Sequence, residues 1–411
     1  MGWQNRAQAG ASGISVFKSL QHRNFRLYYL GQLISLNGTW MQNVAQAWLI
    51  YRLTESSFML GLAAFCGLFP VLLLGLWGGV IADHVNRHRL LIIAHTAGLI
   101  QAFLLGLLTL SGLVEPWHIL VFSTVLGIIH AFEMPARHSF ISDMVTRKNL
   151  PNAIALNSSA FNIARFLGPF MAGILVALWG EGVVFMINAA SFLAVLYGLQ
   201  LMRISPVITD GENMPVLLKI RQGLVFAWSN RQIRLSLMLL SVFSIVGTSL
   251  TVLMPVFTDI IFLGDSEVLG TLLGAMGLGA LLGAFTLAYH SSYHLLHIRI
   301  GVAGFVAGLC LLVFPSISVV MLALPLLALF GYCQTILAAS TNTMIQSLVE
   351  DKLRGRVMSV FSTVFIGFMP IGSLVSGSVS EVIGVQNTVY SLGIISLMCS
   401  SIYLLVIRSR L

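Results

Sequence analysis

The stretch GGVIADHVNRHR, residues 78–89, lies where one long apolar segment ends and the next begins. Residues 58–82 and residues 90–112 on either side are predominantly apolar. Each segment is long enough to cross a bilayer as a helix, which takes about 20 residues. The stretch between them carries one carboxylate, Asp83, and several basic side chains. It therefore predicts a short polar turn between two membrane-spanning helices.

The same alternation continues in both directions along the 411-residue chain. Hydrophobic residues make up 57% of the chain and charged residues 9%, whereas soluble domains contain about 25% charged residues. The apolar segments are 26–51, 58–82, 90–112, 117–134, 153–178, 183–203, 232–262, 267–289, 298–314, 318–345, 357–381 and 386–407. The sequence thus predicts an all-α integral membrane protein with 12 transmembrane helices.

The 22 Lys and Arg residues are divided unequally between the two sides of this arrangement. Both ends of the chain and the even-numbered connections hold 20 of them, and the odd-numbered connections hold Arg52. The remaining one, Arg165, lies within the fifth segment. Because Lys and Arg stay on the cytoplasmic side of a membrane, both termini are expected in the cytoplasm. The formal charge of +8 then indicates contact with anionic lipid rather than with nucleic acid.

A long central connection divides the segments into two groups of six. Residues 204–231 begin with polar and proline residues and end with an amphipathic stretch. Such a stretch is typical of a helix that lies on the membrane surface. We expect an amino-terminal bundle over 1–203, a cytoplasmic linker with this helix over 204–231, and a carboxy-terminal bundle over 232–411.

Glycines recur in the two halves at an offset of 204 residues. Gly173 and Gly180 correspond to Gly377 and Gly384. Because six is an even number of crossings, two copies of a six-helix unit run in the same sense about an axis along the membrane normal. The pattern predicts parallel repeats, the plan of a carrier that rocks one half against the other.

The turn at 78–89 resembles the loop between the second and third helices of the major facilitator superfamily. That loop has the pattern Gly-x-x-x-Asp-basic-x-Gly-basic-basic. Gly79, Asp83 and Arg87 match it, and Arg89 falls one place late. The resemblance implies that these four residues form a conformational latch. The alternative is a charged turn set by topology alone.

A closer resemblance covers roughly residues 20–205. The runs GTWMQ at 38–42, MPAR at 134–137 and RFLGP at 165–169 are similar to a bacterial branch of the superfamily that includes the enterobactin exporter. This resemblance implies a secondary transporter of the bacterial inner membrane that works by alternating access. It would export a siderophore-like, amphiphilic or anionic molecule in exchange for protons. Multidrug efflux and lysophospholipid transport are the alternatives.

Arg165 is the basic residue that topology does not explain. Placing a guanidinium at the centre of a bilayer costs at least about 2.5–3.5 kcal/mol, so it should face water or a carboxylate. Asn162 shares its helical face, and we expect Glu133, which shares a face with Arg137, to be its partner. One interpretation is a structural ion pair. The other is a functional site, where Arg165 attracts an anionic substrate group or Glu133 exchanges a proton.

Polar side chains also recur at helical spacing in the first and tenth segments. The candidate substrate-binding residues there are Trp40, Gln42, Asn43, Gln46, Gln334 and Asn342. We expect them to line a water-filled path between the halves. The alternative is that they hold neighbouring helices together, at about 0.6 kcal/mol for each interhelical hydrogen bond.

Several classes of function are excluded by what the sequence lacks. No Gly-x-x-x-x-Gly-Lys-Ser/Thr run is present, so ATP is not expected to drive transport directly. No His-Glu-x-x-His motif is present, so an enzyme is not expected. The 4 cysteines lack paired spacing, which argues against disulfides and zinc. We expect a monomer without cofactor or metal, whose partners are a small-molecule substrate, protons and lipid.

Overall fold

The computed structural model describes residues 17–202, 216–289 and 295–408, which form helices joined by short turns. The helices are α1 (Arg23–Thr54), α2 (Ser57–His84), α3 (Arg87–Leu110), α4 (Pro116–Met144), α5 (Leu150–Gln200), α6 (Val216–Ser229), α7 (Arg231–Val256), α8 (Ser266–Tyr289), α9 (Leu296–Val313), α10 (Val320–Leu348), α11 (Asp351–Ile383) and α12 (Val385–Arg408). Short turns of π- or 3₁₀-helix, η1 (Lys18–Gln21), η2 (Phe257–Ile261) and η4 (Phe314–Ser316), extend some of them.

Ten helices in the described part of the chain are long and apolar enough to cross a membrane. Two further observations bring the structure to the expected 12. The 32-residue helix α1 is long enough, although polar residues interrupt it. The 51-residue helix α5 bends at Gly180, where φ is 80°, and so consists of two spans. Each predicted segment coincides with a helix or with one half of α5. Helix α4 continues 10 residues beyond the predicted end at 134, and α11 begins 6 residues before the predicted start at 357.

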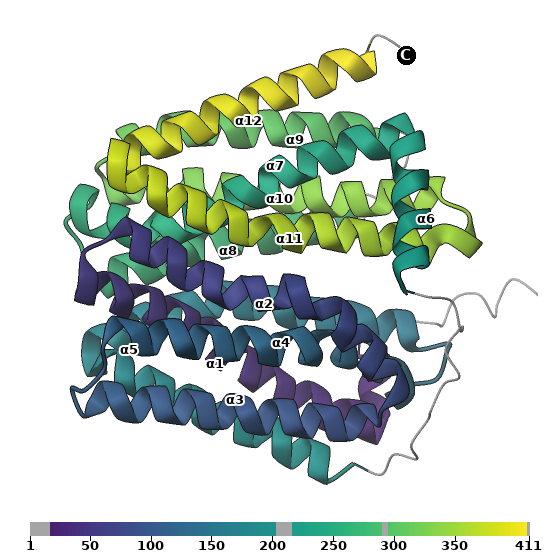
Figure 1. Cartoon of the computed structure of the whole chain (residues 1–411), viewed down its shortest axis with the longest axis horizontal. Coiled ribbons are helices and arrows are strands. Elements are labelled where there is room, and N and C mark those ends of the chain that lie inside the picture. Colours follow the sequence, from purple (N-terminus) through teal and green to yellow (C-terminus); the bar gives the residue numbers. More distant parts are fainter. Residues whose placement is uncertain (1–16, 203–215, 290–294, 409–411) are drawn as a thin grey trace, which may run out of the picture.

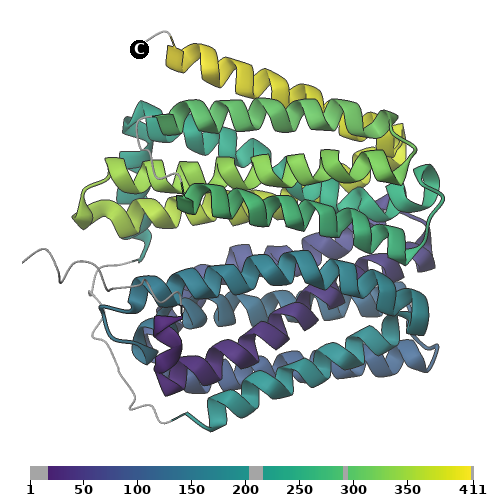
Figure 2. The same ribbon diagram turned by 180° about the vertical axis from the view of Figure 1, so that it is seen from behind.

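The helices form two bundles that lie side by side (Figure 1). Helices α1 to α5 make the amino-terminal bundle, drawn from purple to teal, and α7 to α12 make the carboxy-terminal bundle. Gly180 and Gly384 have nearly the same positive φ, 80° and 82°, at the offset that the sequence repeats. Viewed from behind, the bundles remain separate stacks of nearly parallel helices (Figure 2). This is the architecture of the major facilitator fold.

Helix α6 lies across the ends of the other helices rather than along them (Figure 1). The predicted amphipathic helix is therefore present over Val216–Ser229. It is fixed to the carboxy-terminal bundle, because Gly223 packs against the backbone of Arg356 on α11. The linker residues 203–215 that precede it lie outside the described part of the chain.

The two ends of the molecule differ in charge, and we name them accordingly. The basic end is where α1 begins, α2 turns into α3, and α12 ends, and the acidic end is opposite. Arg52 is the basic residue that sequence topology assigns to the acidic end. It forms a two-pronged ion pair with Glu181, with Nε–Oε1 and Nη2–Oε2 distances of 2.9 and 3.1 Å. That pairing explains how a cation is accommodated among the acidic residues.

Hydrophobic packing joins the two bundles toward the acidic end. One continuous core cluster extends from Leu49 and Val176 in the amino-terminal bundle to Leu253 and Phe257 in the other bundle. A separate cluster that includes Phe25 belongs to the amino-terminal bundle alone and lies toward the basic end. The apolar contact between the bundles is therefore concentrated at one end of the molecule.

Candidate functional site

Helices α2 and α11 cross with their backbones almost in contact. A Cβ atom added to Gly61 would lie 3.0 Å from the Cα of Gly377, and one added to Gly377 would lie 2.9 Å from the Cα of Gly61. Real Cβ atoms essentially never approach backbone closer than about 3 Å. Glycine on both helices is therefore what allows this crossing between the bundles.

Helices α5 and α8 make the equivalent crossing on the other side of the interface. A Cβ added to Gly173 would lie 2.9 Å from the Cα of Gly270. Ser266 Oγ also donates a hydrogen bond of 3.2 Å to the carbonyl of Gly173. Gly173 and Gly377 are related by the offset of 204, and a serine precedes the partner glycine by four residues in each case, as Ser57 and Ser266. The two crossings thus have the same arrangement of two glycines and one serine.

Polar contacts at the acidic end reinforce these crossings. Glu381 accepts hydrogen bonds from the Ser56 hydroxyl at 3.2 Å and from the Phe58 backbone N–H at 3.1 Å, at the start of α2. Tyr51 donates a 2.9 Å hydrogen bond to Asp259. Between the described residues of the two bundles, every hydrogen bond found lies toward this end. The structure is therefore closed at the acidic end.

Arg165 lies at the crossing of α5 and α8. Its backbone carbonyl is packed against Gly277, where a side chain would not fit. Its side chain is half-buried, and no described residue forms an ion pair or hydrogen bond with it. A guanidinium that is desolvated but unpaired attracts an anion strongly.

The predicted pair between Glu133 and Arg165 is wrong. Glu133 instead faces Arg137 one turn along its own helix, with Oε1–Nε at 3.4 Å, and His130 Nδ1 lies 3.9 Å from Oε2. Glu133 and Arg137 are 5% and 6% exposed. Residues at i and i+4 on a helix are neighbours, so this carboxylate already has a cation and does not need a second one from α5.

Of the expected binding residues, Trp40 packs against the helix that carries Arg165, and Asn162 lies on that helix. Trp40 on α1 is half-buried and packs edge-on against Phe161, with ring centroids 5.7 Å apart. Asn162, also half-buried, donates to the Ser158 carbonyl of its own helix at 2.9 Å, which leaves its amide oxygen available. Asn43 is exposed. These positions remain candidates for contact with a substrate.

Gln42 and Gln46 of α1 face the inside of the amino-terminal bundle. Gln42 is 0% exposed; it donates to Gln101 on α3 at 3.0 Å and accepts from Asn188 on α5 at 2.7 Å. Gln46 donates to Ser123 on α4. In this state both amides join helices within one bundle, which is the alternative that the sequence left open. Gln101, Asn188 and Ser123 are partners that periodicity along α1 could not identify.

The candidates in the carboxy-terminal bundle are less buried. Gln334 is half-buried and donates to the Phe243 carbonyl on α7 at 3.3 Å. Asn342, also half-buried, accepts a hydrogen bond from Gln346 one turn further along α10. Both have remaining polar atoms that a substrate could use.

The expected latch has a partner that the sequence did not reveal. Arg87 Nη1 lies 3.2 Å from both carboxylate oxygens of Asp143, at the end of α4, and Nε donates to the Ala82 carbonyl. Gly79 has open space where a Cβ would be, and Arg89 is exposed. The side chain of Asp83 lies outside the described residues. Asp143 was recognisable as an isolated acid among basic residues, but not as the partner of Arg87.

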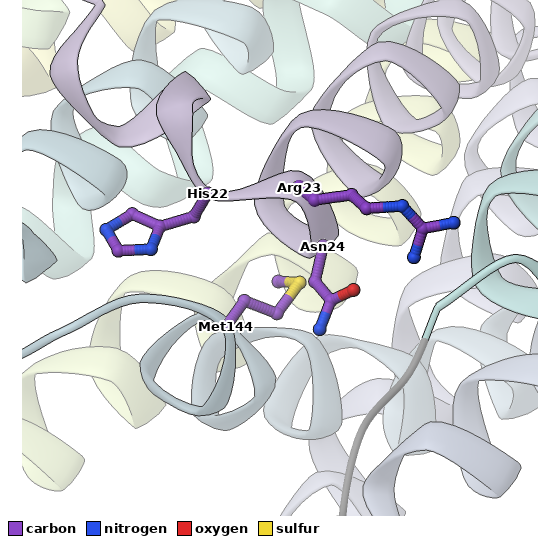
Figure 3. Close-up of a pocket in the computed structure, with 4 residues that line it drawn as sticks. All are labelled: His22, Arg23, Asn24 and Met144. Carbon is purple, nitrogen blue, oxygen red and sulfur yellow. The ribbon is translucent and has the colours of Figure 1, made fainter.

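A hollow of about 420 Å³ is also present at the basic end, lined by His22, Arg23, Asn24 and Met144 (Figure 3). It is open to the surroundings and lies between the start of α1 and the end of α4. None of the expected site residues lines it, so it is separate from the candidate transport path.

Comparisons with known proteins agree with this architecture. A family profile described as "Transmembrane secretion effector" matches residues 14–411. The staphyloferrin A transporter of Staphylococcus aureus is 27% identical over 389 residues, which cover 93% of this chain and 96% of that protein. The multidrug efflux pump Tap of Mycolicibacterium fortuitum is 25% identical, covering 89% and 91% of the two chains. The enterobactin exporter EntS of Shigella boydii is 26% identical, covering 90% and 88%.

Among solved structures, a bacterial homologue of the human lysosomal transporter Spinster, in an inward-facing and unoccupied conformation, superposes with a TM-score of 0.69. The match covers 93% of this chain and 96% of that chain at 15% identity. At that identity the likeness shows a shared fold.

Proposed function

This chain belongs to the transmembrane secretion effector family of the major facilitator superfamily, and on that premise we propose that it exports a siderophore-like anionic or amphiphilic molecule. It is a secondary transporter and not an enzyme. The observation that supports an anionic cargo best is Arg165, a half-buried guanidinium without an ion-pair partner among the described residues, at a contact between the two bundles.

Two of the relatives support the choice of cargo. One is named as a transporter of staphyloferrin A and another as an exporter of enterobactin, and both compounds are siderophores. A carboxylate or catecholate oxygen is a suitable partner for a guanidinium, which donates in a planar fork. Asn162 and Trp40 next to Arg165 would supply an amide and an apolar ring to the same molecule.

The charge of the two ends of the molecule supports an orientation in which cargo is taken up from the cytoplasm. If the basic end faces the cytoplasm, as Lys and Arg do in membrane proteins, the closed acidic end faces outward. Cargo would then enter between the bundles from the cytoplasm of a bacterial inner membrane. Alternating access would separate the glycine crossings at the acidic end and close the basic end, where the Arg87–Asp143 pair lies.

Protons are the proposed source of energy. Glu133 is a buried acid within a span, and an intramembrane acid is by default a functional residue in transporters. The chain would act as a monomer, with the bundles over 1–203 and 232–411 as its two moving parts.

Multidrug efflux is the second candidate. The relative named Tap is a multidrug efflux pump, and the Trp40–Phe161 ring pair could bind apolar cations as well as amphiphiles. The two candidates differ in the charge of the cargo, because Arg165 would repel a cation.

Transport by the purified full-length protein in proteoliposomes distinguishes these candidates. We expect uptake of staphyloferrin A and little uptake of ethidium, with R165Q abolishing the first. Ethidium transport that is indifferent to R165Q would instead support multidrug efflux.

A further inference from the structure

We propose that His95 and His130 flank Glu133 as a two-imidazole proton-binding site inside the amino-terminal bundle. This inference rests on the proposed proton coupling and assigns its residues: His130 admits the proton and His95 holds it. The three groups come from two helices, α3 and α4, at the same part of the bundle.

The first observation is that Glu133 lies between cations and imidazoles. His130 Nδ1 is 3.9 Å from Oε2, and Arg137 Nε is 3.4 Å from Oε1. His95, on α3, lies within electrostatic range of Glu133, Arg137 and His130. One carboxylate is therefore shared among three groups that are, or can become, positively charged.

The second observation is that Nε2 of His95 is buried without a hydrogen-bond partner in the described part of the chain. The residue is 4% exposed, and its Nε2 has no partner among the described residues. Its ring packs against Phe192 of α5, with centroids 5.9 Å apart, which fixes the ring without satisfying the nitrogen. A buried polar atom without a partner is costly and is often retained for function.

A further unpartnered atom belongs to Tyr28 on α1. Tyr28 is within electrostatic range of both Glu133 and Arg137, and its hydroxyl has no hydrogen-bond partner among the described residues. Among the described side chains, the charged and titratable groups that face His95 are His130, Glu133 and Arg137 of α4. Helix α5 contributes Phe192.

The imidazoles suit proton binding better than the carboxylate does in this state. Glu133 is already in an ion pair, which requires it to be ionised. A neutral imidazole can be buried without a counter-ion, and the charge that it gains with a proton can pair with a carboxylate. His130 has 31% of its side chain exposed, so it is the imidazole of the site that borders the surroundings of the bundle core.

Arg137 and a protonated His95 would compete for the one carboxylate. In the arrangement seen here Arg137 holds Glu133, the site is formally neutral, and His95 carries no proton. In the loaded arrangement the His95 ring nitrogen has gained one proton, pairs with Glu133, and leaves the site with one positive charge. No other bond forms or breaks. The proton-free arrangement belongs to the state closed at the acidic end, as antiport requires.

The plain alternative is that His95 is a neutral core residue that packs on Phe192. A measurement of histidine protonation in the full-length protein distinguishes the two interpretations, and it requires no cargo. In nanodiscs, ¹⁵N-labelled imidazoles are followed by NMR as the pH is lowered from about 8 to about 3.5. The signal lost in H95Q, or in H95N if H95Q does not fold, belongs to His95.

We expect the His95 signal to titrate, and E133Q to weaken its proton affinity at least tenfold, because the paired carboxylate is gone. H88Q is the matched control, since His88 lies on the same helix and contacts the Leu199 carbonyl instead. A His95 ring that stays neutral throughout, or that E133Q does not affect, would overturn the proposal.

A flux measurement tests the role in transport. Proteoliposomes containing a pH dye are supplied with staphyloferrin A or ethidium as cargo probes. We expect the cargo-driven proton flux of H95Q to be at least tenfold lower than that of the wild type, while H95Q keeps cargo counterflow. H88Q should match the wild type. Wild-type proton flux in H95Q would refute the site. Absence of proton flux in the wild type with either probe would refute proton coupling itself, and the NMR result would still decide whether His95 binds a proton.

Discussion

Gly61 of α2 and Gly377 of α11 bring the two bundles into backbone contact at the acidic end, where a Cβ on either residue would lie 3.0 Å or less from the Cα of the other. Gly173 and Gly270 repeat this contact between α5 and α8. The state seen here therefore depends on four small residues, arranged in two equivalent pairs.

Replacing a glycine at either crossing by a larger residue should favour opening of the acidic end. We expect G61V or G270V to reduce transport at least tenfold, because the added side chain meets backbone that cannot give way. Labelling of single cysteines at the acidic end by an impermeant maleimide would report the shift. G75A is a matched control on α2, because a Cβ at Gly75 has nothing within 4 Å; equal effects of G75A and G61V would contradict this explanation.

Glu381 should stabilise the same closed state by a smaller amount. Its carboxylate accepts hydrogen bonds from Ser56 and from the Phe58 N–H at the start of α2, where a negative charge is favourable. Because Glu381 is exposed, we expect E381Q to increase maleimide labelling at the acidic end only about threefold, consistent with roughly 0.6 kcal/mol. Unchanged labelling would show that the contact does not hold the bundles together.

Arg165 should matter for transport and not for stability. Since no described residue pairs with it, R165Q breaks no ion pair, and we expect its melting temperature to match or exceed that of the wild type. Transport of an anionic cargo should nevertheless be lost, and R165K should restore part of it, because lysine keeps the charge but not the planar fork. A strongly destabilised R165Q would indicate a structural role instead.

Arg137 should show the opposite behaviour. Removing it leaves the buried Glu133 carboxylate without its cation, and breaking a buried pair costs about 3–5 kcal/mol. We therefore expect R137A to melt well below the wild type, and the double variant R137A/E133Q to recover much of that loss. If the double variant were no more stable than R137A, the Glu133–Arg137 pair would not be the source of the effect.

The pair between Arg52 and Glu181 is exposed on one side only. Arg52 has 55% of its side chain exposed, whereas Glu181 has 8%, so removing the cation leaves a mostly buried carboxylate without its partner. We expect R52A to lower the melting temperature, by less than R137A does, and to leave transport unchanged. A large loss of transport would show that Arg52 acts on the cargo.

The sequence was sufficient for the fold because the signals for it are local. The length of the apolar segments located the spans, and the amphipathic pattern located α6. Gly180 and Gly384 marked the repeat, because each stands where the backbone has a positive φ that only glycine adopts easily. These features need no knowledge of which helix faces which. The split of α5 at Gly180 was likewise visible as a short gap between two apolar segments.

The site was less predictable because its partners come from different helices. The polar stripe of α1 could face the path or the bundle interior, and Gln42 turned out to bond to Gln101 and Asn188. Glu133 had one cation on its own helix and one on α5, and spacing alone could not choose between them. Side-chain packing decides between such alternatives, and the hydropathy of the sequence carries no information about packing.

The most direct test is accumulation of radiolabelled staphyloferrin A by inside-out vesicles that contain the full-length protein, with the lumen made acidic. We expect accumulation above the equilibrium level that collapses when a protonophore is added and is absent in R165Q. Uptake that is indifferent both to the pH gradient and to R165Q would contradict a proton-driven exporter of anionic cargo.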